Sequence, residues 1–98
     1  MLGEDSKRPV SVLVVDDEAV IGIVLSELLS DFGFDVTVAA SGTEGEAKLA
    51  DGLFDILITD KNLPGIDGVE LARRAKAHDA NIEIILITGY PSSESIEE

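Results

Sequence analysis

The 98-residue sequence has no cysteine and no tryptophan, and only 4% of its residues are aromatic. Without cysteine, neither a disulfide nor a thiolate metal site can form, which is compatible with a reducing cytoplasm. The scarcity of aromatic residues means that the core must be built from aliphatic side chains. With 45% hydrophobic residues at this length, we expect one globular domain.

Basic residues are also scarce, with seven Lys and Arg against 20 Asp and Glu and a net charge of −13. This balance argues against nucleic acid and anionic membranes as partners, because both require a basic surface. No run approaches the roughly 18 apolar residues of a membrane span, and the N-terminus lacks the apolar region of a signal peptide. We therefore expect a soluble cytoplasmic protein whose acidity can concentrate cations.

Short β-branched apolar runs alternate along the chain with stretches of helical periodicity. This alternation predicts an α/β fold with a doubly wound parallel sheet, covered by helices on both faces. Strands are expected over residues 10–15, 34–39, 54–59 and 82–87, and helices over about 21–32, 43–50 and 69–78, with Gly33 as a C-terminal cap and a further helix starting at Ser92 or Ser93. The first helix shows one apolar stripe, formed by Ile21, Val24, Leu25, Leu28, Leu29 and Phe32.

Polar residues follow the carboxyl ends of three predicted strands. Asp16 and Asp17 end the first strand, Asp60 ends the third, and Thr88 ends the fourth. In the flavodoxin-like strand order 2-1-3-4-5, the first and third strands are neighbours where the strand order reverses, which is where ligands bind. We therefore expect the three carboxylates to face one another across a crevice, with a hydroxyl beside them.

Such a cluster is unstable alone, because like charges about 4 Å apart repel by roughly 1–4 kcal/mol. A hard divalent cation with oxygen ligands, such as Mg²⁺, removes the repulsion. Asp60 is then the candidate nucleophile for an aspartyl phosphate, and Thr88 could bind a phosphoryl oxygen. A purely structural interpretation of each Asp, as turn former or helix cap, competes with this one. It suffices for Asp55 and Asp67, and His78 is interpreted as a solvated residue at a helix end.

Three segments together resemble the receiver domains of two-component systems. Val-Leu-Val-Val-Asp16-Asp17-Glu18 is similar to their acidic pair, and Thr88-Gly89 to the end of their fourth strand. Asp60-Lys61-Asn62-Leu63-Pro64-Gly65-Ile66-Asp67-Gly68 resembles the phosphoacceptor and its Pro-Gly loop. The resemblance covers about residues 9–98, so residues 1–8 are interpreted as an N-terminal tail.

The resemblance implies that a histidine kinase or a phosphotransfer protein phosphorylates Asp60. It implies that Asp17, Asp60 and the backbone carbonyl of Asn62 bind Mg²⁺ directly, while Asp16 acts through water. Thr88 would move toward the phosphoryl group, and Asn62 and Tyr90 would tune dephosphorylation. By the same resemblance the protein is not a turnover enzyme, and it catalyses only its own phosphorylation and dephosphorylation.

The sequence departs from this family after the fourth strand. Receiver domains continue with a fourth helix, a fifth strand that ends in Lys-Pro, and a fifth helix, whereas this sequence ends at Glu98. We therefore expect a receiver domain truncated after the start of its fourth helix. The edge of the fourth strand would then favour self-association.

Two rival functions remain open. One is a protein-interaction module of receiver fold that is never phosphorylated, which the lack of the expected lysine favours and the intact acidic cluster opposes. The other is a phosphatase of the haloacid-dehalogenase type, which also uses a strand-end Asp. That family requires a second acid two residues after its nucleophile, and Asn62 stands there.

Overall fold

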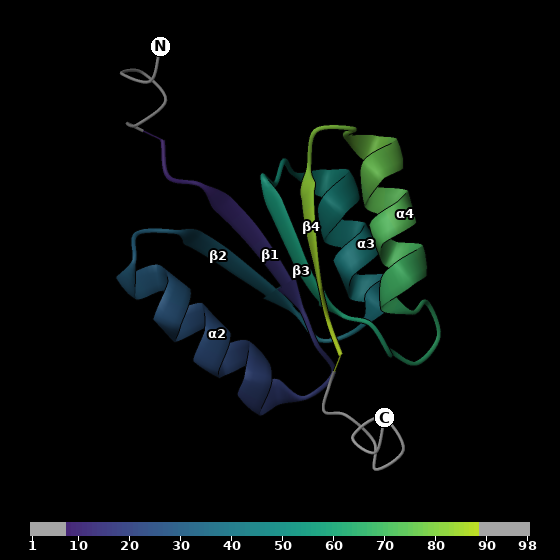
Figure 1. Cartoon of the computed structure of the whole chain (residues 1–98), viewed down its shortest axis with the longest axis horizontal. Helices are drawn as coiled ribbons and strands as arrows, with labels where there is room; N and C mark the ends of the chain where they lie inside the picture. The colour runs from purple at the N-terminus through teal and green to yellow at the C-terminus, as the bar shows by residue number, and fades with distance from the viewer. Residues whose placement is uncertain (1–7, 89–98) are drawn as a thin grey trace, which may run out of the picture.

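Figure 1 shows the computed structural model of the chain, which describes residues 8–88. Four parallel strands form one sheet in the order β2-β1-β3-β4. The elements follow one another as β1 (Ser11–Val15), α2 (Ala19–Asp31), β2 (Asp35–Ala39), α3 (Gly42–Asp51), β3 (Ile56–Asp60), α4 (Gly68–His78) and β4 (Glu83–Ile87). The fold and strand order predicted from the sequence are confirmed. Most of the proposed tail and the helix proposed near Ser92 lie outside the described residues.

Helices cover both faces of the sheet. Helix α2 lies against β1 and β2 on one face, while α3 and α4 lie side by side on the other (Figure 1). None of the helices within residues 8–88 combines the length and apolar character needed to cross a membrane. The two-sided cover explains why β1, at the centre of the sheet, is almost wholly apolar.

The core lies between the sheet and the helices α3 and α4. Leu13 and Val15 of β1 and Leu57 of β3 point into it and are completely excluded from solvent. The helices contribute Leu49, Leu71 and Ala75, and Ala39, Leu63 and Ile82 complete the cluster. Every member is aliphatic, as the shortage of aromatic residues required. Burial of a side chain such as Leu57 contributes about 1.5–3 kcal/mol to folding.

The apolar stripe predicted for α2 is only half buried. Ile21, Leu25 and Leu29 are partly buried against the sheet, whereas Leu28 is 51% and Phe32 74% exposed. The stripe is partly exposed because Gly22, which is not one of its apolar residues, packs against the sheet. Gly22 is the fully buried residue of the helix, and a Cβ there would lie 2.9 Å from Cγ1 of Val38. The closest approach of α2 to β2 therefore runs through Gly22, which turns part of the stripe toward solvent.

Candidate functional site

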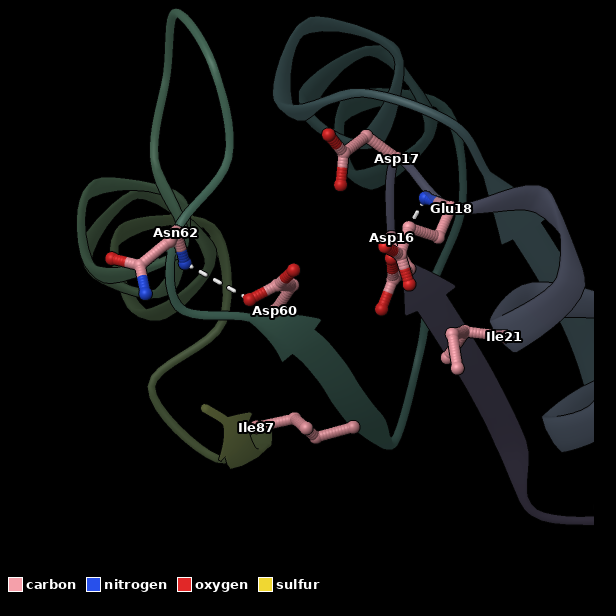
Figure 2. Close-up of a pocket in the computed structure, with 7 residues that line it drawn as sticks. All are labelled: Asp16, Asp17, Glu18, Ile21, Asp60, Asn62 and Ile87. Carbon is pink, nitrogen blue, oxygen red and sulfur yellow. Dashed lines mark hydrogen bonds between the residues drawn. The ribbon is translucent and has the colours of Figure 1, made fainter. Parts of the chain in front are cut away.

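Three carboxylates meet where β1 and β3 end. Asp16 and Asp17 follow β1, and Asp60 is the last residue of β3, which pairs in parallel with β1. One carboxylate oxygen from each residue lies within 4.8 Å of those from the other two. Figure 2 shows these side chains around one hollow. The strand order therefore brings together the three acids that the sequence placed at strand ends.

The three carboxylates have different surroundings. Asp16 is 6% exposed, and its Oδ1 accepts a hydrogen bond from the backbone N–H of Glu18 at 2.8 Å. Asp60 is partly buried, and its Oδ1 accepts from the backbone N–H of Asn62 at 3.0 Å. Asp17 is exposed. Each hydrogen bond leaves the second carboxylate oxygen of Asp16 or Asp60 available to another ligand.

The buried member of the cluster is electrostatically strained. Burial raises the pKa of Asp16 above its ordinary value, and the negative charges of Asp60 and Asp17 raise it further, while the hydrogen bond from Glu18 opposes them. A cation between the carboxylates would offset the repulsion from Asp60 and Asp17 and lower the pKa of Asp16. Carboxylate oxygens are the ligands that Mg²⁺ and Ca²⁺ prefer, so the donor set fits a hard divalent cation.

The cluster forms one side of a pocket of about 390 Å³. Figure 2 shows its seven lining residues: Asp16, Asp17, Glu18, Ile21, Asp60, Asn62 and Ile87. None of these seven is a lysine or arginine. Within residues 8–88, the lining of the pocket thus combines acidic side chains with the apolar side chains of Ile21 and Ile87.

The lining residues only partly match the sequence predictions. Asn62 is one of the lining residues, whereas Thr88 is exposed after β4 and is not one of them. Glu18, Ile21 and Ile87 were missed as members of the site. The position of Glu18 directly after the acidic pair could have indicated it. Gly89 and Tyr90 lie outside the described residues.

Asp55 and Asp67, which were interpreted from the sequence as structural residues, both accept backbone hydrogen bonds. Oδ2 of Asp55 accepts from the backbone N–H of Ser11 at 2.8 Å, and Arg8 lies 3.6 Å from the same oxygen. Oδ1 of Asp67 caps α4 by accepting from the backbone N–H of Glu70 at 2.9 Å. His78 is exposed at the end of α4 and lines a different, smaller cavity of about 170 Å³.

Comparison with known proteins identifies relatives over most of the chain. The family described as the response regulator receiver domain matches residues 12–98. Sporulation initiation phosphotransferase F of Bacillus subtilis is 33% identical over 87 residues, which are 89% of this chain and 70% of that protein. The transcriptional regulatory protein YkoG of the same organism is 37% identical over 81 residues, 83% of this chain but 36% of that protein.

Solved structures show the same fold. The response regulator protein TrrA of Thermotoga maritima, solved in complex with Mg(2+)-BeF, is 37% identical and superposes with a TM-score of 0.77. That match covers 83% of this chain and 70% of the other.

Proposed function

Because this chain belongs to the response regulator receiver domain family, we propose that it accepts a phosphoryl group on Asp60 from a histidine kinase or a phosphotransfer protein. The observation that carries the proposal is the cluster of Asp16, Asp17 and Asp60 at the ends of β1 and β3. Asp60 is the nucleophile because it ends β3 opposite the acidic pair. Its side chain also borders the pocket that a phosphodonor would enter.

Mg²⁺ is the proposed cofactor. Asp17, Asp60 and the backbone carbonyl of Asn62 would hold the ion directly, and Asp16 would hold it through water. Bound Mg²⁺ would neutralise charge on the phosphoryl oxygens during transfer. The pKa of Asp16 is raised first by burial and further by the negative charges of Asp60 and Asp17, and this part from the neighbouring charges supports a cation at this place. The relative TrrA was solved with Mg(2+)-BeF, which is a second support.

The proposed reaction is a phosphoryl transfer between a nitrogen and an oxygen. A carboxylate oxygen of Asp60 forms a bond to phosphorus while the P–N bond of phosphohistidine breaks, and the imidazole leaves and takes up a proton. The hydrogen bond from the Asn62 N–H to Oδ1 orients the carboxylate, so Oδ2 is the oxygen free to attack. Thr88 would move toward the pocket, and its hydroxyl would then donate a hydrogen bond to a phosphoryl oxygen.

The proposal makes this protein a signalling component rather than a turnover enzyme. It would catalyse its own phosphorylation and hydrolysis, and the phosphorylated form would be the signal. A cytoplasmic location is part of the same proposal, and the lack of cysteine is compatible with it.

Intact mass spectrometry tests the proposal directly. After incubation with Mg²⁺ and acetyl phosphate, the mass of the wild-type chain should rise by one phosphoryl group. Asp60→Asn should abolish the increase, whereas Asp51→Asn, which alters an exposed Asp at the end of α3, should keep it. The proposal is contradicted if the mass of the wild-type chain stays unchanged with acetyl phosphate and also with a phosphorylated phosphotransfer protein.

One observation favours a second candidate, a receiver-fold interaction module that is never phosphorylated. Among residues 8–88, no basic side chain lines the pocket, so none of these residues would offer a positive charge to a phosphoryl group. This candidate predicts that a phosphotransfer protein binds the chain while the mass of the chain stays the same.

A further inference from the structure

The loop between β3 and α4, residues 61–67, carries Asn62 and so determines where its backbone lies in the site. Its two ends are tied together, because the backbone N–H of Gly68 donates to the carbonyl of Lys61 at 2.9 Å. In between, Leu63 is buried in the core. Gly65 has a φ of +74°, a conformation that side chains rarely adopt.

Gly68 lies where a side chain would collide with the site backbone. A Cβ there would overlap the carbonyl oxygen of Asp60 and lie 2.8 Å from Cα of Lys61. Both atoms belong to the chain that leads from the nucleophile into the loop. A side chain at 68 therefore has to displace this segment, and with it the peptide of Asn62.

Gly42 makes an equivalent contact from a different element. It is the first residue of α3 and is buried. A Cβ there would overlap the carbonyl oxygen of Ile66 and lie 3.0 Å from Cβ of that residue. The three heavy atoms nearest to a Cβ at position 42 all belong to Ile66, so a side chain there would press on the loop.

The start of α3 is fixed more firmly than the loop it touches. Oγ of Ser41 caps α3 by accepting from the N–H of Glu44 at 3.0 Å, and Oε1 of Glu44 accepts from the N–H of Ala40, the residue before the cap, at 2.9 Å. In the loop, Gly65 lies beside Ile66 and has no side chain that would restrict a change in its backbone angles. An added methyl group at position 42 is therefore relieved by movement of the loop rather than of the helix.

From these contacts we propose that Gly42 and Gly68 are positioning residues, which hold the loop so that the backbone of Asn62 stays beside Asp60. The proposal rests on the function proposed above, because it gives the loop its role in metal binding. Substitution of either glycine by alanine should shift the loop, break the hydrogen bond between Asn62 and Asp60, and weaken Mg²⁺ binding.

The chain provides a matched control in Gly45. This glycine is also buried in α3, one turn after Gly42, but a Cβ there would meet side chains of the core, Cγ2 of Val15 at 2.9 Å and Cδ2 of Leu71 at 3.3 Å. Gly45→Ala should therefore lower stability without moving the loop. The comparison separates a general packing defect from a specific effect on the site.

Two measurements on the unphosphorylated 98-residue chain test the proposal. In metal-free protein, amide hydrogen exchange by NMR should show that the Asn62 N–H loses protection in Gly42→Ala and Gly68→Ala but keeps it in Gly45→Ala. By calorimetric titration, the same two variants should bind Mg²⁺ on the order of tenfold more weakly than wild type, the effect typical of groups that orient ligands. Gly45→Ala should bind Mg²⁺ like wild type.

The proposal would be overturned if the Asn62 N–H kept its protection from exchange in both Gly42→Ala and Gly68→Ala. It would also be overturned if Gly45→Ala lost as much of this protection as they do. If Gly42→Ala and Gly68→Ala both fail to fold while Gly45→Ala folds, the proposal is also wrong, because the close contacts of Gly42 and Gly68 would then be needed for folding itself. A wild type that is not phosphorylated contradicts only the proposed function, since the hydrogen-exchange comparison needs neither metal nor phosphodonor.

Discussion

At the scale of single residues, the carboxylate of Asp17 is the one whose charge can be removed with least disturbance. It is exposed, whereas Asp16 and Asp60 each accept a backbone hydrogen bond. Its oxygen lies within 4.8 Å of oxygens of both other acids. Two like charges at such a distance repel by about 1 kcal/mol even in a highly polar medium.

Asp17→Asn should therefore stabilise the metal-free protein by about 1 kcal/mol. Urea unfolding in the presence of EDTA measures this change, with Asp51→Asn as the control for the removal of one surface charge. In wild type, Mg²⁺ should raise the unfolding midpoint, because it binds only the folded cluster. An Asp17→Asn variant that unfolds at lower urea concentration than wild type would show that the three charges do not repel one another.

Asp16 predicts an unusual pH dependence. Its pKa is raised in the folded protein, first by burial and then by the charges of Asp60 and Asp17. Between the unfolded pKa and this raised value the folded state binds more protons, so the free energy of unfolding falls as the pH increases. The metal-free protein should thus lose stability as the pH rises through the folded pKa of Asp16, and regain it on acidification to just above the ordinary Asp pKa.

The variant Asp16→Asn isolates this effect, because its side-chain oxygen can still accept the hydrogen bond from Glu18. It should be more stable than wild type at neutral pH without metal, and the difference should shrink as the pH falls through the window. Urea unfolding of both proteins at a series of pH values measures the difference. A constant difference over that series would mean that Asp16 does not titrate with a raised pKa.

The sequence predicted the acids of the site better than its apolar wall. Asp16, Asp17 and Asp60 could be found because they occur together at the ends of two strands that the predicted strand order makes neighbours, although a single Asp after a strand is often only a turn former. Ile21 and Ile87 could not be recognised, because an apolar residue that borders a pocket has the same periodicity as one in the core. The raised pKa of Asp16 depends on burial and distances, which a sequence does not contain.

At the scale of elements, α4 connects the loop of the site to the core. Its first turn is capped by Asp67, whose Oδ1 accepts from the N–H of Glu70. Glu70 also pairs with Arg73 and Arg74, and Arg74 reaches Glu46 of α3 at 2.8 Å. These pairs are partly exposed and contribute little, so the cap is the stronger local determinant of where the helix begins.

Asp67→Ala should lower the free energy of unfolding by about 1 kcal/mol, the usual loss when a helix cap is removed. Asp67→Ser should retain most of the stability, because its hydroxyl can accept the same hydrogen bond. Urea unfolding of the two variants side by side gives the comparison. Equal losses in Ala and Ser would contradict a capping role and indicate that the charge of Asp67 matters instead.

Helix α2 shows where periodicity alone is insufficient. The apolar stripe predicted the helix correctly, but the buried line runs through Gly22. Hydrophobicity scales give glycine little weight, whereas close packing of a helix on a strand favours the residue without a side chain. The stripe therefore predicts that a helix forms, and the position of Gly22 decides which side of it contacts the sheet.

At the scale of the whole molecule, β4 leaves an edge of the sheet unpaired within residues 8–88. The backbone N–H of Glu83 donates to the carbonyl of Asp55, and the carbonyl of Ile87 accepts from the backbone N–H of Lys61. Because backbone groups alternate in direction along a strand, residues 83, 85 and 87 direct their N–H and C=O groups toward β3. Residues 84 and 86 turn theirs outward. Ile85 and Leu86 are 48% and 43% exposed, which makes this edge both apolar and able to form hydrogen bonds.

An antiparallel pair of β4 strands from two copies satisfies this edge. Centred on Ile85, it sets residue 84 of one copy against residue 86 of the other, so that all outward N–H and C=O groups of these two residues are paired. The same register places Glu83 opposite Ile87, which keeps the two Glu83 charges apart. We therefore predict that the purified 98-residue chain self-associates, and more strongly at higher salt, where repulsion between two copies of charge −13 is screened.

Leu86→Pro tests this register, because it removes an N–H that points away from β3 and leaves the ladder within the chain intact. By symmetry two intermolecular hydrogen bonds are lost, about 2 kcal/mol, so the dissociation constant should rise roughly 30-fold. Leu86→Ala is the matched control, since it removes apolar surface but keeps the N–H. Sedimentation velocity over a range of concentrations measures both variants. If Leu86→Ala weakens association as much as Leu86→Pro, apolar contact rather than strand pairing holds the copies together. A wild type that stays monomeric at high concentration and moderate salt would show that repulsion between the acidic copies outweighs the attraction of the exposed edge.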